Sequence, residues 1–170
     1  AGMKYTGITN GYQFTFTPQA TITDGKHSIT INASDNDGNA ATAVTASFTV
    51  DTVPPTLTVS SPTTGSITNK SAATVSGKTN DATSSPVSVT ITLNGASVGS
   101  VTVGSDGSFA KAITLAEGQN TIVVTAKDGA GKTSSVTIKV KLDTTVPKLS
   151  SITLTPNPAN VSSSVAITVE

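Results

Sequence analysis

Carboxylates at turns and in a linker are the side chains of this sequence best suited to a chemical task. Asp81 and Asp128 each follow a stretch expected to form a strand, Asp24 precedes a glycine, and Asp51 opens a proline-containing segment. Ca²⁺ accepts hard oxygen ligands from several loops, usually about six to eight of them. Asp is also an ordinary turn residue, because its side chain accepts hydrogen bonds from nearby main-chain N–H groups. Spacing alone leaves both interpretations open.

Catalysis needs acid, base or nucleophile groups that converge, and this sequence holds few of them. Cys is absent, which excludes thiol chemistry and disulfides, and the one His is His27. We expect His27 at an edge position near the start of a strand, on the face shared with Ile29 and Ile31. Glu occurs only at Glu117 and Glu170, so a paired-carboxylate glycosidase site is not expected. The sequence therefore favours a protein that is not an enzyme.

An internal repeat organises the elements that must position these residues. Residues 24–35 (DGKHSITINASD) align with residues 117–128 (EGQNTIVVTAKD), and both continue through a Gly-rich turn. Each copy then runs to a similar stop, DTVPP at 51–55 and DTTVP at 143–147. The offset of about 92 residues is the size of one immunoglobulin-like sandwich. We therefore expect the C-terminal part of a module at 1–51, a complete module at 52–143, and the first strands of another at 144–170.

Alternation of apolar and polar residues predicts the strands of the complete module. Apolar side chains recur at every second position in three stretches, 87–93, 122–126 and 136–142, and two earlier strands are expected at 56–60 and 73–77. Asn-Gly, Asp-Gly and Glu-Gly pairs separate these stretches and suit tight turns. About seven short strands with turns every 8–12 residues indicate an all-β chain of tandem immunoglobulin-like antiparallel β-sandwiches.

This topology is expected to bring four aspartates together. With strands labelled A to G, the last strand of a module leaves near its E–F turn, and the B–C and F–G turns of the next module face that junction. Asp24 belongs to the first E–F turn, Asp51 to the linker, Asp81 to the B–C turn and Asp128 to the F–G turn. A Ca²⁺ ion bound there would offset their repulsion and stiffen the linker.

Two other acidic stretches are weaker candidates for a metal. The second junction offers Glu117 and Asp143, but partners from a following module are not in the sequence. Residues 35–39 (DNDGN) look like a short Ca²⁺ loop in composition, yet they lack the remaining ligand positions, so we expect a hairpin turn.

Several segments of the chain resemble bacterial immunoglobulin-like repeats. They are DTVPPTLTV at 51–59, VSG at 75–77, LNG at 93–95, DGSF at 106–109 and the stretch 117–128. The turn at 128–132 (DGAGK) departs from the usual pattern, because Lys132 stands where Asn is common. Such repeats occur in cell-surface adhesins, S-layer-associated proteins and accessory parts of secreted polysaccharide enzymes. The resemblance implies an extracellular or cell-surface location.

Composition excludes some partners. Ten Lys balance ten acidic residues and Arg is absent, so there is no positive field for nucleic acid. No apolar run is long enough to span a membrane. Thr and Ser, roughly a third of the chain, are expected on the solvent faces of the alternating strands.

The residue types give little support to two further possibilities, sugar binding and an isopeptide cross-link. Tyr12, Phe14 and Phe16 share one face and fit a core better than a carbohydrate platform, and Phe109 also fits a core. A Lys-based isopeptide needs a buried Lys, but Lys139 and Lys141 fall on the solvent face. The sequence therefore favours neither a carbohydrate platform nor an isopeptide cross-link.

The sequence therefore favours a structural spacer or stalk that displays other domains, with neighbouring modules of the same chain as its partners. The alternative is an adhesive or polysaccharide-binding module that contacts a cell-wall or host polysaccharide or protein. The partial end modules cannot meet within one chain, so strand complementation between chains is also expected.

Overall fold

A computed structural model describes residues 4–8, 11–15, 21–35, 37–148, 150–155, 162, 164 and 166–169 of this chain. Within that part the chain is all-β, as expected, and holds no helix. The strands are β1 (Lys4–Ile8), β2 (Gly11–Thr15), β3 (Gly25–Ile31), β4 (Val44–Val50), β5 (Thr56–Ser61), β6 (Ile67–Thr68), β7 (Ala72–Asn80), β8 (Ser88–Leu93), β9 (Ala96–Ser97), β10 (Ser108–Thr114), β11 (Gly118–Lys127), β12 (Thr133–Leu142), β13 (Ile152–Thr155) and β14 (Ala166–Val169).

An immunoglobulin-like sandwich occupies the middle of the chain. One sheet has the order β10-β7-β5 and the other β6-β12-β11-β8-β9. All pairs are antiparallel except β6 with β12, which run parallel. In order along the chain, β5, β7, β8, β11 and β12 correspond to the expected strands, and β10 is a further strand whose range was not predicted. The boundaries of the repeating unit itself stay a prediction.

The core lies between the two sheets and is built from the alternating apolar positions. Ile122, Val124 and Ala126 of β11 are completely buried, whereas Lys139 and Lys141 of β12 point to solvent. Each fully buried Val or Ile contributes roughly 1.5–3 kcal/mol through removal of its apolar surface from water. The buried apolar residues are Val75, Val87, Val89, Ile91, Phe109, Ile113, Leu115, Ile122, Val124, Ala126, Ile138, Val140 and Leu142.

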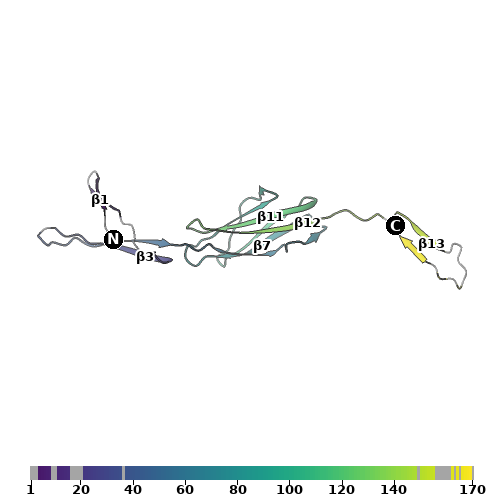
Figure 1. Cartoon of the computed structure of the whole chain (residues 1–170), viewed down its shortest axis with the longest axis horizontal. Coiled ribbons are helices and arrows are strands. Elements are labelled where there is room, and N and C mark those ends of the chain that lie inside the picture. Colours follow the sequence, from purple (N-terminus) through teal and green to yellow (C-terminus); the bar gives the residue numbers. More distant parts are fainter. Residues whose placement is uncertain are drawn as a thin grey trace.

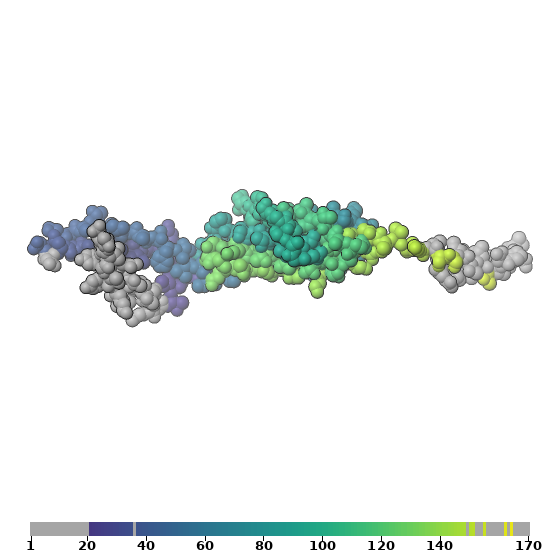
Figure 2. Space-filling view, turned by 90° about the horizontal axis from the view of Figure 1, so that it is seen from above, coloured from purple at the N-terminus to yellow at the C-terminus, as the bar shows by residue number. Residues whose placement is uncertain are grey.

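Two-stranded pairs lie before and after the sandwich. The chain is elongated, with the β3–β4 pair on one side of the sandwich and the β13–β14 pair on the other (Figure 1). A third pair, β1 with β2, precedes β3. After β12 the chain narrows to a single segment (Figure 2).

Gly77 in β7 lies where a neighbouring strand and the core leave no room for a side chain. A Cβ atom at this position would lie 2.1 Å from the carbonyl oxygen of Thr58 and 2.7 Å from Cζ of Phe109. The neighbouring strand β5 carries an irregularity between Val59 and Ser61, directly beside this point. Any side chain here must therefore displace backbone as well as the Phe109 ring.

We expect Gly77→Ala to lower the free energy of unfolding by about 2–3 kcal/mol, because overpacking against backbone cannot be relieved by a rotamer change. Denaturant unfolding followed by circular dichroism measures this. Thr137→Ala, on the solvent face of β12, is the control and should change stability by no more than about 0.5 kcal/mol. Equal effects of the two substitutions would contradict the packing argument.

Candidate functional site

Asp51 directly follows β4 and begins the linker that leads to the first strand of the sandwich, β5. It is only 9% exposed although it lies in a linker. Its Oδ1 accepts a hydrogen bond from the main-chain N–H of Val53 at 3.1 Å, and its Oδ2 accepts one from the hydroxyl of Ser84. Nearby, the carbonyl of the buried Pro55 accepts a hydrogen bond of 2.5 Å from the Ser134 hydroxyl. The linker is thus bonded to both the B–C loop and the last strand of the sandwich.

Asp81 begins the B–C loop directly after β7. Its Oδ1 accepts hydrogen bonds from the main-chain N–H groups of Thr83 and Ser84, both at 2.8 Å. These bonds, with that from Ser84 the larger, hold the pKa of Asp81 below its ordinary value despite the opposing effect of burial. The carboxylate is therefore ionised in the folded protein at neutral pH.

Asp128 begins the F–G turn directly after β11. It is 5% exposed, and its Oδ1 accepts a hydrogen bond of 2.8 Å from the main-chain N–H of Lys132. Its Oδ2 is buried and has no hydrogen-bond partner among the described residues. The main-chain N–H of Gly129 donates to the carbonyl of Ser84 at 2.9 Å, which fixes the F–G turn against the B–C loop.

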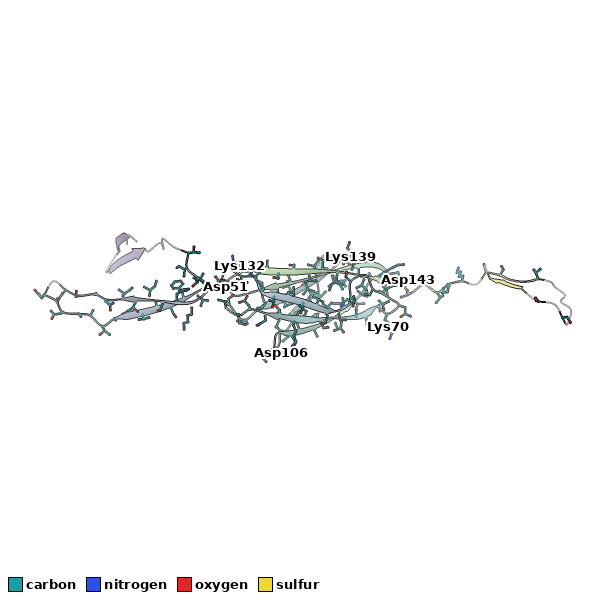
Figure 3. The ribbon with its side chains drawn as sticks, turned by 60° about the horizontal axis from the view of Figure 1, so that its bottom comes forward. Asp51, Lys70, Asp106, Lys132, Lys139 and Asp143 are labelled. Carbon is teal, nitrogen blue, oxygen red and sulfur yellow. The ribbon has the colours of Figure 1, made fainter. Side chains whose placement is uncertain are left out.

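Three of the four aspartates named from the sequence come together. Asp51, Asp81 and Asp128 each place a carboxylate oxygen within 4.8 Å of the others, and we call these residues the aspartate cluster. It lies at the end of the sandwich that faces β3 and β4, where Figure 3 shows Asp51 beside Lys132. Ionised carboxylates at this separation repel one another, and burial strengthens the repulsion. Chemically, the cluster offers only hard oxygen donors.

Asp24 is not part of the aspartate cluster. Its carboxylate instead accepts hydrogen bonds from the main-chain N–H and the hydroxyl of Thr52, at 2.9–3.1 Å. We call this arrangement, a carboxylate of the E–F turn bonded to the first Thr of the linker, the linker clasp. Both oxygens of Asp24 are thus directed to Thr52, Oδ1 to its main-chain N–H and hydroxyl and Oδ2 to the hydroxyl.

The second junction repeats the linker clasp. Glu117 accepts hydrogen bonds from the main-chain N–H of Thr144 at 3.2 Å and from its hydroxyl at 2.8 Å. Asp143, which follows β12 as Asp51 follows β4, accepts from the main-chain N–H and hydroxyl of Thr145. Its other oxygen pairs with Lys141 Nζ at 2.9 Å. These bonds, the Thr145 hydroxyl first, lower the pKa of Asp143 from 3.8 to about 2.

The sequence did not predict the residues that hydrogen-bond to these carboxylates. Ser84 contacts Asp51, Asp81 and the F–G turn, and Thr52 and Thr144 complete the two clasps. The repeated Asp-Thr at 51–52 and 143–144 was a usable signal for the clasp. No comparable signal marks Ser84, because Ser is abundant throughout the chain.

The remaining candidates take the places expected of ordinary structural residues. The ring of His27 bonds the carbonyl of Thr23 at 2.7 Å and stacks on Phe48 with centroids 5.5 Å apart. Asp35 accepts hydrogen bonds from the main-chain N–H groups of Asp37 and Asn39, as an aspartate at a turn does. Phe109 is buried in the core. The side chains of Tyr12, Phe14 and Phe16 fall outside the described residues.

Surface depressions on the described part of the sandwich do not gather a catalytic set. One lies over β5 and β7 and is lined by Thr56, Thr58, Lys78, Thr79, Asn80, Ser105 and Asp106. Its charged residues pair weakly, Lys78 Nζ and Asp106 Oδ2 being 3.7 Å apart with both side chains largely exposed. A second depression over β7 and β10 is lined by Ala, Thr and Ile side chains.

Residues 55–144 match the family described as glucodextranase, domain B, and this match covers more than half of the chain. The chain belongs to the glucodextranase domain B family. Residues 3–52 match the family described as bacterial Ig-like domain. The resemblance to bacterial immunoglobulin-like repeats is thereby confirmed. The domain B family takes its name from one domain of an enzyme, and the match identifies a module type rather than an activity.

Solved structures give more distant likenesses to this domain B family member. Fibronectin(III)-like modules of Clostridium thermocellum CbhA align with a TM-score of 0.46 and 17% identity, over 72% of this chain and 64% of theirs. An engineered protein aligns with a TM-score of 0.41 and 23% identity, over 52% of this chain and 20% of its own. The chain therefore spans less than two thirds of either structure. No curated protein matches it.

The lowered pKa of Asp143 predicts how its hydrogen bonds contribute to stability as the pH changes. Because the pKa of Asp143 is lowered, its hydrogen bonds stabilise the folded form above pH 3.8, and this contribution is lost as the pH falls towards 2. We expect Thr145→Val to raise the pKa of Asp143 towards 3.8, because the largest cause of the shift is removed. A carboxyl NMR titration measures it. Thr144→Val, which removes a bond to Glu117 instead, should leave the pKa of Asp143 unchanged.

Proposed function

We propose that this chain is a structural spacer in a bacterial cell-surface or secreted protein, where its modules hold other domains apart. The observation that carries the proposal is the linker clasp, which recurs at both ends of the sandwich. Thr52 is held by Asp24 on the entering side, and Thr144 by Glu117 on the leaving side. Each clasp fixes the first linker residue to the module it leaves, so fewer linker torsions are free to bend.

Bonds between the first linker and the sandwich add to this restraint. Asp51 bonds the B–C loop through Ser84, and Pro55 is buried against β12. Proline itself restricts the backbone torsions of the linker at Pro54 and Pro55. The first linker is therefore tied to the modules on both of its sides, which suits a rod more than a flexible tether.

The surface and the family support a non-catalytic, extracellular role. The exposed strand faces carry mostly Thr and Ser, and the net charge is zero. Among the described residues, charged side chains meet in the ion pairs Lys78–Asp106 and Lys141–Asp143 and in the aspartate cluster. Domain B and bacterial Ig-like families point to accessory modules of extracellular proteins. No helix in the described part could cross a membrane.

Small-angle X-ray scattering at one fixed calcium concentration tests the spacer. We expect the wild-type chain to scatter as an extended rod with a narrow distribution of conformations. Replacing Asp24 and Glu117 together by Ala removes both clasps and should broaden the distribution and shorten the mean end-to-end distance. Asp106→Ala removes a turn carboxylate away from both linkers and is the matched control. A wild-type chain that already scatters as freely jointed beads would contradict the proposal.

A second candidate function is polysaccharide binding, favoured by one observation. The β3–β4 pair leaves Ile29, Ile31 and Val44 exposed, with Phe48 38% exposed and stacked by His27. Aromatic faces at a protein surface are suited to stacking against sugar rings.

If this candidate is correct, wild-type protein binds to a glycan array and Phe48→Ala abolishes the signal. Val53→Ala, which removes an exposed apolar side chain in the linker, should retain binding. Absence of any glycan signal with the wild type removes this candidate and leaves the spacer unaffected.

A further inference from the structure

We propose that the aspartate cluster, Asp51, Asp81 and Asp128, binds one Ca²⁺ ion at the end of the sandwich that receives the first linker. The strongest observation is the state of Asp128, which is 5% exposed and whose Oδ2 has no partner among the described residues. Buried polar atoms are nearly always bonded, and an unpaired buried carboxylate oxygen is especially unfavourable. Asp128 also contributes a carboxylate oxygen to the group of atoms, within 4.8 Å of one another, that a single ion could bridge.

The hydrogen bonds leave the correct oxygens available. In all three residues Oδ1 accepts from a main-chain N–H, donated by Val53, by Thr83 and Ser84, and by Lys132. These bonds orient each carboxylate and occupy the same one of its two oxygens. The Oδ2 atoms of Asp81 and Asp128 remain for a cation, and Oδ2 of Asp51 shares the region with the Ser84 hydroxyl. The loops are thus arranged in advance around a common point.

Charge balance also points to a cation. The described residues form two ion pairs, Lys78 with Asp106 and Lys141 with Asp143, and neither involves the aspartate cluster. The comparison with Asp143 is direct, because Asp143 is the repeat equivalent of Asp51. Lys141 neutralises Asp143 from two residues before it, whereas Thr49 stands two residues before Asp51. The first junction has therefore lost the lysine that compensates the second.

The donor set selects Ca²⁺ among common metals. All donors are oxygens, which disfavours zinc and copper sites that use His or Cys. They come from a linker and two separate loops, and Ca²⁺ tolerates such irregular sets of ligands at 2.3–2.6 Å. Mg²⁺ requires near-ideal octahedral geometry and usually keeps several of its waters, so it gains less from three protein carboxylates. Extracellular Ca²⁺ modules bind with Kd values of about 10⁻⁴ to 10⁻³ M.

Binding would connect residues that are far apart in sequence. Asp51 belongs to the linker, whereas Asp81 and Asp128 belong to the sandwich that follows it. One ion would thus join the linker to two loops of that sandwich, in addition to the contact through Ser84. The site is contained in residues 51–128 and does not depend on what the whole chain displays, so its test is separate from that of the spacer.

The experiment compares the whole chain in EGTA and in millimolar Ca²⁺. We expect Ca²⁺ to raise the melting temperature by roughly 5–15 °C, because a ligand that binds only the folded state stabilises it by RT ln(1 + [L]/Kd). Isothermal titration calorimetry should give about one Ca²⁺ site per chain, with a Kd of about 10⁻⁴ to 10⁻³ M. No shift and no heat with the wild-type protein would overturn the proposal.

Asp128→Asn is the decisive variant because it keeps an oxygen to accept the Lys132 N–H bond and removes the charge. We expect the Ca²⁺ affinity to fall at least about tenfold, since affinity follows the number of charged ligands. Without Ca²⁺ the variant should be as stable as the wild type or more stable, because repulsion is relieved. A variant whose Ca²⁺ response equals that of the wild type would overturn the assignment.

The repeat supplies matched controls. Asp35 is the equivalent of Asp128 in the preceding module, and it also accepts a bond from the residue four positions later, Asn39. Asp35→Asn should leave the Ca²⁺ shift unchanged within about 1 °C. Asp81→Asn repeats the test from the other loop should Asp128→Asn fold poorly. An equal shift with Mg²⁺ at the same concentration would contradict selection of Ca²⁺.

Discussion

Main-chain N–H groups at the ends of strands need acceptors, and this requirement governs where the acidic residues of the molecule lie. A β-sheet satisfies the N–H groups inside it, but the turns that leave it do not. Eight acidic residues accept at least one hydrogen bond from a main-chain N–H in a turn or linker: Asp24, Asp35, Asp51, Asp81, Asp106, Glu117, Asp128 and Asp143. The acids are few, yet nearly all of them shape the backbone.

The same requirement explains why a turn residue and a metal ligand are not competing interpretations. A carboxylate that accepts an N–H through one oxygen presents the other in a fixed direction. Where such a turn stands alone, as at Asp35 or Asp106, the second oxygen faces water or a nearby polar group. The sandwich topology places the B–C loop, the F–G turn and the incoming linker together. Only there, within the described residues, do three oriented carboxylates gather.

Alternation in the sequence was sufficient for the fold and for part of the site. Ile91, Ile122 and Val140 are buried because every second side chain of a strand in one sheet points towards the other sheet. The convergence of Asp51, Asp81 and Asp128 follows from the order of turns at one end of the sandwich, which the strand pattern already implies. Asp24 does not join them, because its turn lies within reach of Thr52, and local bonds of this kind have no periodic signature.

The two modules also show that the repeat preserves hydrogen bonds more than residue types. Asn120 is fully buried and bonds Ala116 and Gly118 of the E–F turn, together with Asn94. Its repeat equivalent, His27, bonds the carbonyl of the residue four positions earlier, as Asn120 does. The E–F turn needs a side-chain N–H donor at that position, and either an amide or an imidazole supplies one.

Charge is the property that the repeat does not preserve. At the second junction, Lys141 pairs with Asp143 and neutralises its charge. At the first junction, Thr49 stands in the place of Lys141, so no lysine in that position neutralises Asp51. Because the fold tolerates either residue on the solvent face of a last strand, the junctions can differ in electrostatics without a change in the sandwich.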